Sequence, residues 1–416
     1  MKVLVVGRGG REHAMVWKVA QEADEVFAAP GNDGMKELAQ CVEIDENDHE
    51  QLIDFAKKKE IDLTIIGPEQ PLADGIVNKF QEAGLAVFGP TKEAAFIETS
   101  KSYAKELMAK YDIPTAKSQT FSSYKEAKDY VEQQGAPIVI KADGLAAGKG
   151  VTVAGTVKEA VQALEEMMEE DKFAGAGQRV VVEEFLEGEE FSLMAFVHGE
   201  KVYPMVISQD HKPAFDGDKG PNTGGMGAYS PVPQLDGVSE RAVETILKPT
   251  ARALVEENRT FTGILYAGLI QTAEGPKVIE FNARFGDPET QVVLPRMKNS
   301  LASVIFAVLS GEDLTLEWSD EAVVGVVLAS GGYPGSYEKG VQINGLDSLD
   351  NETLVFHAGT KQEDGDWKTN GGRILLAACK ADRLQKAQQQ VYQELERLSC
   401  EKAYYRSDIG NRAVSH

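Results

Sequence analysis

The first 90 residues or so alternate regularly between short apolar runs and segments whose apolar residues recur at helical spacing. The apolar runs are KVLVVG, EVFAAPG, DLTIIGP and AVFGP, and the helical patterns between them include HEQLIDFAKKK and a short helix expected near residues 35–39. Strands that alternate with helices predict a doubly wound parallel sheet. We therefore place a first α/β domain at residues 1–100.

A glycine lies at the end of each of these runs, at Gly7, Gly31, Gly67 and Gly89. In an open parallel sheet, ligands bind beyond the carboxyl ends of the strands. We therefore expect the turns GRGG (7–10), PGN (30–32) and GPEQP (67–71) to line one edge of the sheet together.

The first turn, GRGGRE, matches a dinucleotide-binding fingerprint only in part. That fingerprint requires G-x-G-x-x-G; Gly7 and Gly9 fit it, but Glu12 occupies the third glycine position. No acidic residue stands clearly at the end of a second strand to hold a ribose. Two alternatives stay open, an ordinary tight turn and a phosphate bound at a helix N-terminus with help from Arg11.

Two predicted strands, PIVIK (137–141) and VTVA (151–154), flank a glycine-rich segment that contains a lysine. The segment is not a P-loop, because Gly144 and Gly148 are one residue too close and Gly150 follows Lys149 where Ser or Thr is required. A P-loop also leads directly into a helix, whereas a second strand follows here. The pattern predicts a hairpin with a glycine-rich tip, which is either a simple turn or a phosphate-binding loop.

The chain beyond residue 100 is α+β in pattern. We predict one helix over residues 92–111, a pair of strands in RVVVEEFLEGEEFSLMAFV, and a further hairpin in GILYAGLIQT and KVIEFNARF. Residues 210–231 have no periodicity, and so long a segment inside a compact protein is expected to be structureless and functional. From about residue 322, strands mix with a long helix over residues 381–398.

The strand KVIEFNARF carries the clearest candidate for metal binding. Strand alternation places Glu280 and Asn282 on one face, with Ile279 and Phe281 on the other. A carboxylate and an amide oxygen side by side suit Mg²⁺, and Arg284 is a fixed cation beside them. The alternative is a half-exposed strand with ordinary polar residues. The lysine hairpin, the acidic strand turn and this pair together predict an ATP site for phosphoryl transfer.

Length, charge and cysteine usage narrow the class of protein. A chain of 416 residues is expected to hold about two to four domains. The net charge of −23 argues against binding to nucleic acid or to anionic membranes. Three separated cysteines without a C-x-x-C pair predict reduced thiols. No signal peptide or membrane span is evident, so we expect a cytoplasmic protein.

Five segments together resemble the ATP-grasp ligases, and more closely the phosphoribosylamine–glycine ligases (glycinamide ribonucleotide synthetases) of purine biosynthesis. The segments are VVGRGGREHA, GPEQPL, IKADGLAAGKGV, DHKPAFDGDKGPNTGGMGAYSP and IEFNARFGDPETQ. The resemblance implies an ATP-grasp core at residues 101–325, with a mobile lid at about 120–188, and a C-terminal mixed α+β domain at 326–416. A monomer is the expected oligomeric state.

The resemblance also implies a reaction. ATP, glycine and 5-phosphoribosylamine would give glycinamide ribonucleotide, ADP and phosphate, with Mg²⁺ or Mn²⁺ as the metal. The carboxylate of glycine would attack the γ-phosphate to form an acyl phosphate, from which the amine of phosphoribosylamine displaces phosphate. Such a transfer depends on neutralising phosphoryl charge and on a lid that excludes water.

The residues that match the family's motifs are assigned by position. ATP contacts are implied for Lys101, Lys141, Gly144, Gly148, Lys149, Gly150, Glu183, Glu184, Leu186 and Glu190, and metal ligation for Glu280 and Asn282. Catalytic roles fall to Arg284, Asp210 and Lys141. Substrate contacts are expected from Gly9, Gly10, Arg11, Asn32, Glu69, Asp210, Asn222, Gly224, Gly225 and Arg284. Among these, Arg284 and Asp210 would hold glycine, and the N-terminal turns would receive phosphoribosylamine.

Two positions depart from the family pattern. Gln70 stands where a small apolar residue is expected, and Pro213 stands where a basic residue is expected. The rival functions are another ATP-grasp carboxylate–amine ligase, a nicotinamide oxidoreductase built on the N-terminal sheet, and a non-catalytic nucleotide sensor. PNTGGMGAY with ARFGDPE disfavours the first, the missing third glycine disfavours the second, and the set of lysines and metal ligands disfavours the third.

Overall fold

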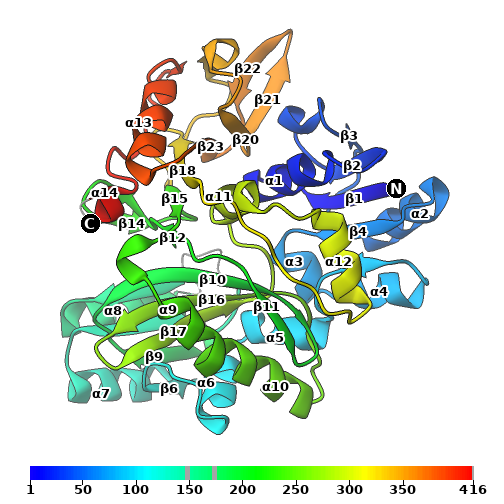
Figure 1. Cartoon of the computed structure of the whole chain (residues 1–416). Coiled ribbons are helices and arrows are strands. Elements are labelled where there is room, and N and C mark those ends of the chain that lie inside the picture. The colour runs from blue at the N-terminus through cyan, green and yellow to red at the C-terminus, as the bar shows by residue number, and fades with distance from the viewer. Residues whose placement is uncertain (146–149, 171–175, 415–416) are drawn as a thin grey trace.

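A computed structural model describes residues 1–145, 150–170 and 176–414. Its N-terminal part is a parallel sheet in the strand order β3-β2-β1-β4-β5. The strands are β1 (Lys2–Gly7), β2 (Glu25–Pro30), β3 (Gln40–Cys41), β4 (Leu63–Ile66) and β5 (Val87–Phe88). The predicted doubly wound sheet is confirmed, and Figure 1 shows it in blue around β1 and β4.

Helices connect these strands as the apolar spacing predicts. They are α1 (Gly10–Val19), α2 (His49–Lys59), α3 (Glu69–Ala73) and α4 (Ile76–Glu82). Asp48 fixes the start of α2 by accepting a hydrogen bond from the Gln51 N–H. The helix predicted near residues 35–39 is wrong. A short 3₁₀ turn, η1 (Asp33–Met35), stands there instead, and Asn32 caps its first turn by accepting from the Gly34 N–H.

The central part contains two antiparallel four-stranded sheets. One has the order β11-β10-β16-β17, and the other has the order β6-β9-β7-β8. Their strands are β6 (Ser118–Phe121), β7 (Ile138–Ala142), β8 (Val151–Ala154), β9 (Val180–Glu184), β10 (Glu189–His198), β11 (Lys201–Pro204), β16 (Thr262–Thr272) and β17 (Gly275–Asn282). The predicted β7–β8 and β16–β17 hairpins are both confirmed. Two helices, α7 (Tyr124–Gln134) and α8 (Val157–Met168), pack with the second sheet.

The helix predicted over residues 92–111 is two helices, α5 (Lys92–Thr99) and α6 (Lys101–Lys110). Ser100 separates them in an extended conformation, and its hydroxyl caps α6 by accepting from the Tyr103 N–H. Serine competes with the helix for backbone hydrogen bonds and therefore favours such a cap. The break places Lys101 at the first position of α6.

Strand β17 contains a β-bulge that the sequence pattern does not reveal. Gly268 pairs with Glu280 and Leu269 pairs with Val278, so the register passes over Ile279. Glu280 and Asn282 alternate with buried Phe281 as predicted, but Val278 rather than Ile279 shares the core with Phe281. A bulge leaves the extra residue outside the ladder, and this frees the Ile279 carbonyl for another partner.

The C-terminal sheet has the order β12-β15-β18-β23-β20 and includes strands from the middle of the chain. Its strands are β12 (Gln209–Asp210), β15 (Gly227–Ser230), β18 (Ala322–Ala329), β20 (Leu354–His357) and β23 (Arg373–Ala381). The expectation that residues 210–231 are structureless is wrong, because β12, β15 and the small hairpin of β13 (Pro213–Phe215) and β14 (Lys219–Asn222) lie there. Such short strands lack a periodic signal. Here β15 pairs with β18, β12 pairs with β15, and β13 pairs with β14.

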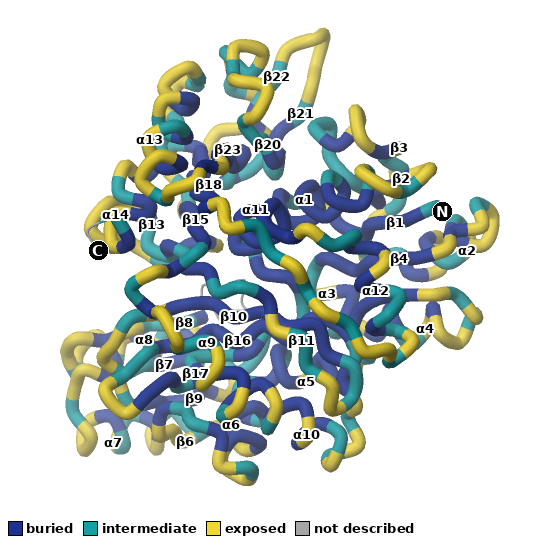
Figure 2. Tube along the Cα trace, viewed as in Figure 1, coloured by how far each residue is buried: buried dark blue, intermediate teal, exposed yellow. Residues whose placement is uncertain are grey.

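The remaining elements cover the edges of these sheets. The helices are α9 (Val238–Ala242), α10 (Lys248–Glu256), α11 (Thr290–Val293), α12 (Leu301–Leu309), α13 (Leu384–Leu395) and α14 (Asn411–Val414). The strands β19 (Gln342–Asn344), β21 (Thr360–Glu363), β22 (Asp366–Thr369) and β24 (Ser399–Cys400) form a small sheet. The sheet interiors are buried and the outer loops exposed (Figure 2). Within the described ranges, no helix is both long and apolar enough to cross a bilayer.

Two buried histidines join the N-terminal and C-terminal parts of the molecule. The His357 N–H donates to Nδ1 of His13 at 2.9 Å, and the two rings lie 5.7 Å apart. His357 also stacks on Trp367, with ring centroids 4.5 Å apart. Burial lowers the pKa of His13 to about 3 and the pKa of His357 to about 4. Both rings are therefore neutral in the folded protein at ordinary pH.

We expect this histidine pair to make the fold sensitive to acid. Below pH 6.5 the unfolded state binds protons that the folded state does not, so stability falls as pH falls toward the folded pKa values. The loss at pH 5 is about 2 kcal/mol for each histidine relative to pH 7.5. Urea unfolding at the two pH values measures it. His13→Gln should reduce the difference and His198→Gln should leave it unchanged; equal differences in all three proteins would contradict the expectation.

Candidate active site

The predicted ATP-contacting lysines lie around the β7, β9 and β17 strands. The Lys141 ammonium lies 3.0 Å from Oε1 of Glu183 and donates to the Ile279 carbonyl at 2.8 Å. That carbonyl is the one that the β17 bulge removes from the ladder. Lys101, at the start of α6, donates to the Gly144 carbonyl at 2.9 Å. The fold thus brings Lys101, Lys141 and the start of the glycine-rich segment together.

Glu280, the predicted metal ligand, lies among these cations. Burial opposes its ionisation, but Lys212, Lys141 and Lys101 together lower the pKa of the carboxyl below its ordinary value. Because Lys141 bonds the carbonyl of the preceding residue, its ammonium stands next to Glu280. The carboxylate is therefore ionised and faces the same space as the phosphate-binding candidates.

Arg284 is held by carboxylates on two different elements. Its Nε lies 3.3 Å from Oε2 of Glu69, and its Nη2 lies 3.2 Å from Oε1 of Glu98. Nη2 also donates to Oδ1 of Asn282 at 3.2 Å, which orients the amide oxygen. Burial works against the charged guanidinium, but Glu98 and Glu69 raise the pKa of Arg284 further. Arg284 is therefore a fixed cation between the N-terminal turn at Glu69 and the β17 strand.

A second group of charges surrounds Asp210. The Lys212 ammonium lies 3.8 Å from Oε2 of Glu190 and 3.9 Å from Oε1 of Glu280. Burial raises the pKa of Asp210 to about 7, with Lys212 opposing the shift and Glu289 and Glu190 adding to it. Lys212 therefore neutralises a cluster of carboxylates beside the candidate metal ligand.

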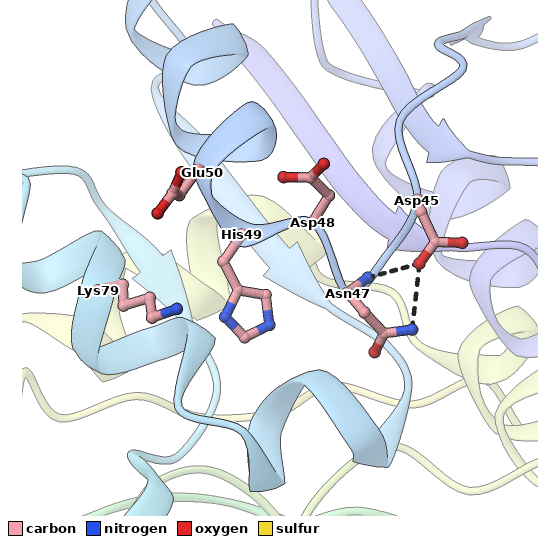
Figure 3. Close-up of a pocket in the computed structure, with 6 residues that line it drawn as sticks. All are labelled: Asp45, Asn47, Asp48, His49, Glu50 and Lys79. Carbon is pink, nitrogen blue, oxygen red and sulfur yellow. Dashed lines mark hydrogen bonds between the residues drawn. The ribbon is translucent and has the colours of Figure 1, made fainter.

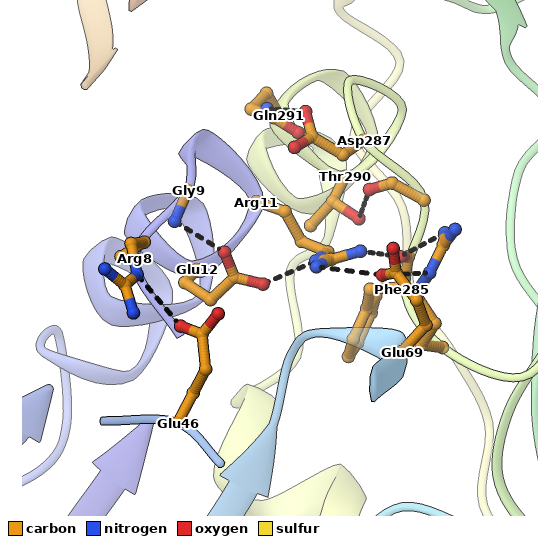
Figure 4. Close-up of polar contacts among 12 residues, drawn as sticks. Arg8, Gly9, Arg11, Glu12, Glu46, Glu69, Phe285, Asp287, Thr290 and Gln291 are labelled. Atoms are coloured by element: carbon orange, nitrogen blue, oxygen red, sulfur yellow. Dashed lines mark hydrogen bonds and ion pairs between the residues drawn. The ribbon is translucent and has the colours of Figure 1, made fainter. Parts of the chain in front are cut away.

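The N-terminal turn reaches this site through Arg11. Its guanidinium donates to Oε1 of Glu12 at 2.5 Å and to the Phe285 carbonyl at 3.2 Å (Figure 4). Its Nη2 also lies 3.9 Å from Oε2 of Glu69. Burial raises the pKa of Glu69, but Arg284 and Arg11 dominate together and hold that pKa at about 2. Arg11 therefore links the edge of the parallel sheet to the segment that follows β17.

Glu12, which stands at the third-glycine position of the fingerprint, lies across the first turn. Its Oε2 accepts from the Gly9 N–H at 2.7 Å. A Cβ at residue 67 would lie 2.2 Å from Oε1 of Glu12, and a Cβ at residue 7 would lie 2.5 Å from its Cγ. Both glycines are therefore needed because the Glu12 side chain crosses the turn.

We expect Gly67→Ala to displace Glu12 from Arg11 and from the Gly9 N–H. Overpacking of this kind lowers the free energy of unfolding by about 1–3 kcal/mol, which urea unfolding measures. Gly155→Ala is the matched control, because a Cβ there would make only an ordinary 3.5 Å contact with Glu159. Equal stability of the two variants would contradict this explanation of Gly67.

Family models match nearly the whole chain in three consecutive parts. Residues 1–98 match the phosphoribosylglycinamide synthetase N domain, residues 99–290 its ATP-grasp (A) domain, and residues 323–412 its C domain. The chain belongs to the phosphoribosylglycinamide synthetase family. The multidomain fold predicted from the sequence is therefore confirmed, as is the resemblance to ATP-grasp ligases.

Relatives named phosphoribosylamine–glycine ligase agree with this membership. The protein from Halalkalibacterium halodurans is 63% identical over 100% of this chain and 98% of its own length. The protein from Listeria innocua is 56% identical over 99% of this chain and 100% of its own. A crystal structure of that ligase from Thermotoga maritima superposes with a TM-score of 0.86 at 34% identity, covering 98% of this chain and 100% of its own.

A more distant structure shows that the fold is shared beyond the synthetase family. The biotin carboxylase domain of Hydrogenobacter thermophilus 2-oxoglutarate carboxylase, solved with MgADP, has a TM-score of 0.73 at 17% identity, and the match covers 97% of this chain and 91% of that one. At this identity the likeness concerns the fold alone.

Several residues predicted to contact substrate instead have structural roles, forming hydrogen bonds within the protein or the start of a helix. The Asn32 amide donates to the carbonyls of Arg8 and His357, and its oxygen accepts from Gly34. Gly9 and Gly10 form the start of α1. Asn32 therefore supports the turn and has little hydrogen-bonding capacity left for a substrate.

The predicted residues of the 222–225 turn lie against the C-terminal part. The Gly224 N–H donates to the Tyr333 hydroxyl at 3.1 Å, and its carbonyl accepts from Arg373 at 2.7 Å. A Cβ at Gly225 would lie 2.4 Å from Pro288, which explains the glycine there. Asn222 ends β14.

The residues predicted to contact the adenine and ribose of ATP lie at the end of β9 and in the segment that follows it. Glu184 accepts from the Lys117 N–H at 2.9 Å, Leu186 is half-buried, and the Glu190 side chain is 53% exposed. Gly144 and Gly150 lie on either side of residues 146–149. The predicted contacts at Gly148 and Lys149 lie outside the described residues.

Sequence reasoning missed several charged residues of the candidate site. They are Glu98, Lys105, Lys212, Asp287, Glu289 and Arg373. One indication of Lys212 was present in the sequence, because this lysine lies two residues after Asp210 and next to Pro213, where a basic residue was expected. The other residues come from separate elements; for example, Arg373 of β23 lies 2.9 Å from Asp287. Their proximity is a property of the tertiary structure.

The residues on β17 fit a divalent metal that a nucleotide helps to bind. In the described ranges, no group of three or more His, Cys, Asp or Glu side chains is arranged to hold a metal ion. Mg²⁺ at nucleotide sites uses one or two carboxylates together with substrate phosphates. The ionised Glu280 and the amide oxygen of Asn282 are suitable donors for such a site.

A surface pocket of about 360 Å³ lies apart from the synthetase site, between α2 and α4 (Figure 3). Its lining residues are Asp45, Asn47, Asp48, His49, Glu50 and Lys79. It adjoins the first turn through the 3.1 Å ion pair between Arg8 and Asp45. None of the residues predicted for ATP, metal or substrate lines this pocket.

Proposed function

We propose that the chain joins glycine to 5-phosphoribosylamine, with conversion of ATP to ADP and phosphate, to give glycinamide ribonucleotide. Membership of the phosphoribosylglycinamide synthetase family supports this reaction. The observation that carries it is that Lys101 and Lys141 lie close enough to the Glu280 carboxylate to lower its pKa, with Lys141 bonded to the carbonyl of the preceding residue. Phosphoryl transfer relies on cations that neutralise the transferring group, and this arrangement supplies them.

Lys101 and Lys141 bind phosphate oxygens in this proposal, and residues 183–186 receive the adenine along their backbone, with Glu190 accepting from the ribose. The family uses ATP with a divalent metal, either Mg²⁺ or Mn²⁺, for which Glu280 and Asn282 are the proposed ligands. A metal held by Glu280 and Asn282 would neutralise phosphate charge there. Gly144, Gly148, Lys149 and Gly150 belong to the glycine-rich segment that closes over the phosphates.

The glycine carboxylate is proposed to bind Arg284, with Asp210 receiving the glycine ammonium. Glu69 and Glu98 fix the Arg284 guanidinium, so its position does not depend on the substrate. A carboxylate held next to the γ-phosphate attacks it to form the acyl phosphate, which is a far better electrophile. Lys212, with its ammonium between Glu190 and Glu280, lies beside this group and limits the repulsion among the carboxylates.

Phosphoribosylamine is proposed to bind at the carboxyl edge of the parallel sheet. Gly9, Gly10 and Arg11 lie there, with Glu69 between Arg11 and Arg284. Asn222, Gly224 and Gly225 form a turn that approaches the same segment through Arg373 and Asp287. The amine then attacks the acyl phosphate and releases phosphate, while closure of residues 120–188 keeps water out.

A substrate-omission experiment tests the function. ADP formation is measured with ATP and Mg²⁺, with glycine and freshly made phosphoribosylamine each left out in turn. The expected result is ADP formation only when both are present, with glycinamide ribonucleotide as product. Turnover with another carboxylic acid and no turnover with glycine would instead identify a different ATP-grasp carboxylate–amine ligase.

We further propose that the protein is a cytoplasmic monomer with domains at residues 1–100, 101–325 and 326–416. The three free cysteines support a reducing compartment. In this division β12 and β15 belong to the central domain by position, yet they complete the C-terminal sheet beside β18. Light scattering tests the oligomeric state, because a dimer would double the mass of 45.2 kDa.

A further inference from the structure

Two buried lysines share one carboxylate beneath the candidate nucleotide site. The Lys105 ammonium, from α6, lies 2.9 Å from Oε2 of Glu183 on β9. The Lys141 ammonium, from β7, lies 3.0 Å from Oε1 of the same residue. Both lysine side chains and the carboxylate are at most 7% exposed. This cluster of two positive charges and one negative charge is therefore largely shielded from water.

The two lysines differ in how their hydrogen-bonding capacity is used. An ammonium has three N–H donors. Besides Glu183, Lys105 donates to Oγ1 of Thr115 at 2.8 Å and to the Ala116 carbonyl at 3.3 Å. Lys141 has only Glu183 and the Ile279 carbonyl as partners among the described residues. In the described part of the chain, Lys141 therefore keeps donor capacity for an anion beyond the Ile279 carbonyl. The donors of Lys105 are instead directed at Thr115, Ala116 and Glu183.

We propose that Lys105 is a positioning residue for nucleotide binding, which acts on Lys141 through Glu183. Lys105 binds Oε2 of Glu183, so Lys141 can interact with only the other carboxylate oxygen, Oε1. Lys105 also leaves the cluster with a net positive charge. Without Lys105, both oxygens of Glu183 could interact with Lys141. The carboxylate would then hold the Lys141 ammonium more strongly and compete with the nucleotide phosphates for it. The inference rests on the proposed use of ATP.

The proposal has a consequence for pH dependence. Burial lowers the pKa of Lys105 to about 8, with Glu183 opposing this shift and Lys141 adding to it. The charged groups that face it are Glu183 and Glu184 from β9 and Lys141 from β7. As pH rises through 8, Lys105 loses its proton and the cluster loses its excess positive charge. Nucleotide affinity therefore falls above this pH.

The experiment measures the Kd of ADP by calorimetry at pH 7.0 and pH 9.5, with and without Mg²⁺. Wild-type affinity is expected to be about 10-fold weaker at the higher pH, as for loss of one nearby charge. K105M should be about 10-fold weaker than wild type at pH 7.0 and should show no further loss. K105R should bind tightly at both values, because arginine stays charged.

K110M is the matched control. Lys110 lies on the same helix, is 64% exposed and pairs with Glu257, so its removal should leave ADP binding as in wild type. Wild-type affinity in K105M at pH 7.0, or a loss at pH 9.5 in K105R equal to that of wild type, would overturn the inference. If K105M does not fold, the K105R profile decides. Failure of wild type to bind either ADP or ATP would instead overturn the proposed function.

Discussion

Replacing Glu280 by alanine is expected to lower the rate of ADP formation by at least about 1,000-fold, because this carboxylate is the proposed anionic ligand of the metal. The remaining protein ligand, Asn282, carries no charge. Removal of Glu280 also leaves Lys212, Lys141 and Lys101 with less negative charge to balance them. The variant would therefore hold the proposed metal poorly, and kcat is expected to fall more than nucleotide affinity does.

Steady-state ADP release measures this effect, and circular dichroism checks that the variant remains folded. Glu274→Ala is the matched control, because Glu274 lies at the turn of the same hairpin and is 78% exposed. The control should retain wild-type turnover. Near-normal ADP release from Glu280→Ala would remove Glu280 from the metal site.

Replacing Lys141 by methionine is expected to lower kcat/KM for ATP by about 100–1,000-fold. Charge-assisted bonds to a phosphate oxygen are strong in a buried site, and Lys141 is the proposed donor. The change also leaves Glu183 with Lys105 alone and the Ile279 carbonyl without its partner. Both effects fall on ATP, so the KM for glycine should change much less than the KM for ATP.

Initial rates at varied ATP and at varied glycine separate these effects. Lys128→Met is the control, since Lys128 lies on α7 and is 40% exposed. It should leave both constants unchanged. A Lys141→Met enzyme with the wild-type kcat/KM for ATP would contradict the phosphate-binding role.

The predictions that succeeded rested on local patterns. Alternating apolar runs predicted the parallel sheet, and strand periodicity predicted the β7–β8 and β16–β17 hairpins. Glu280 and Asn282 do lie on the half-exposed side of β17, because Phe281 between them is buried. Local propensity and periodicity depend on neighbours within a few residues, which the sequence displays directly.

The failed expectation for residues 210–231 and the features that the sequence did not reveal involve partners that are distant in sequence. Strand β15 pairs with β18, about a hundred residues later, and β12 in turn pairs with β15. The bulge at Ile279 is visible only in the register against β16, and its consequence is the hydrogen bond from Lys141. Lys105 carries no local signal for a site, although Lys105 and Lys141 both form ion pairs with Glu183. No spacing along the chain encodes such contacts.

The sequence by itself determined the class of fold, the likeness to ATP-grasp ligases and the placement of Glu280 and Asn282 on one side of β17. Short-range periodicity and compact motifs carry that information, because the side chains concerned are close along the chain. Only the tertiary structure decided how the charges are arranged. Glu183 forms ion pairs with both Lys105 and Lys141, and Arg284 forms ion pairs with Glu69 and Glu98. Such ion pairs depend on how separate elements pack, since electrostatic interactions follow distance in space and burial.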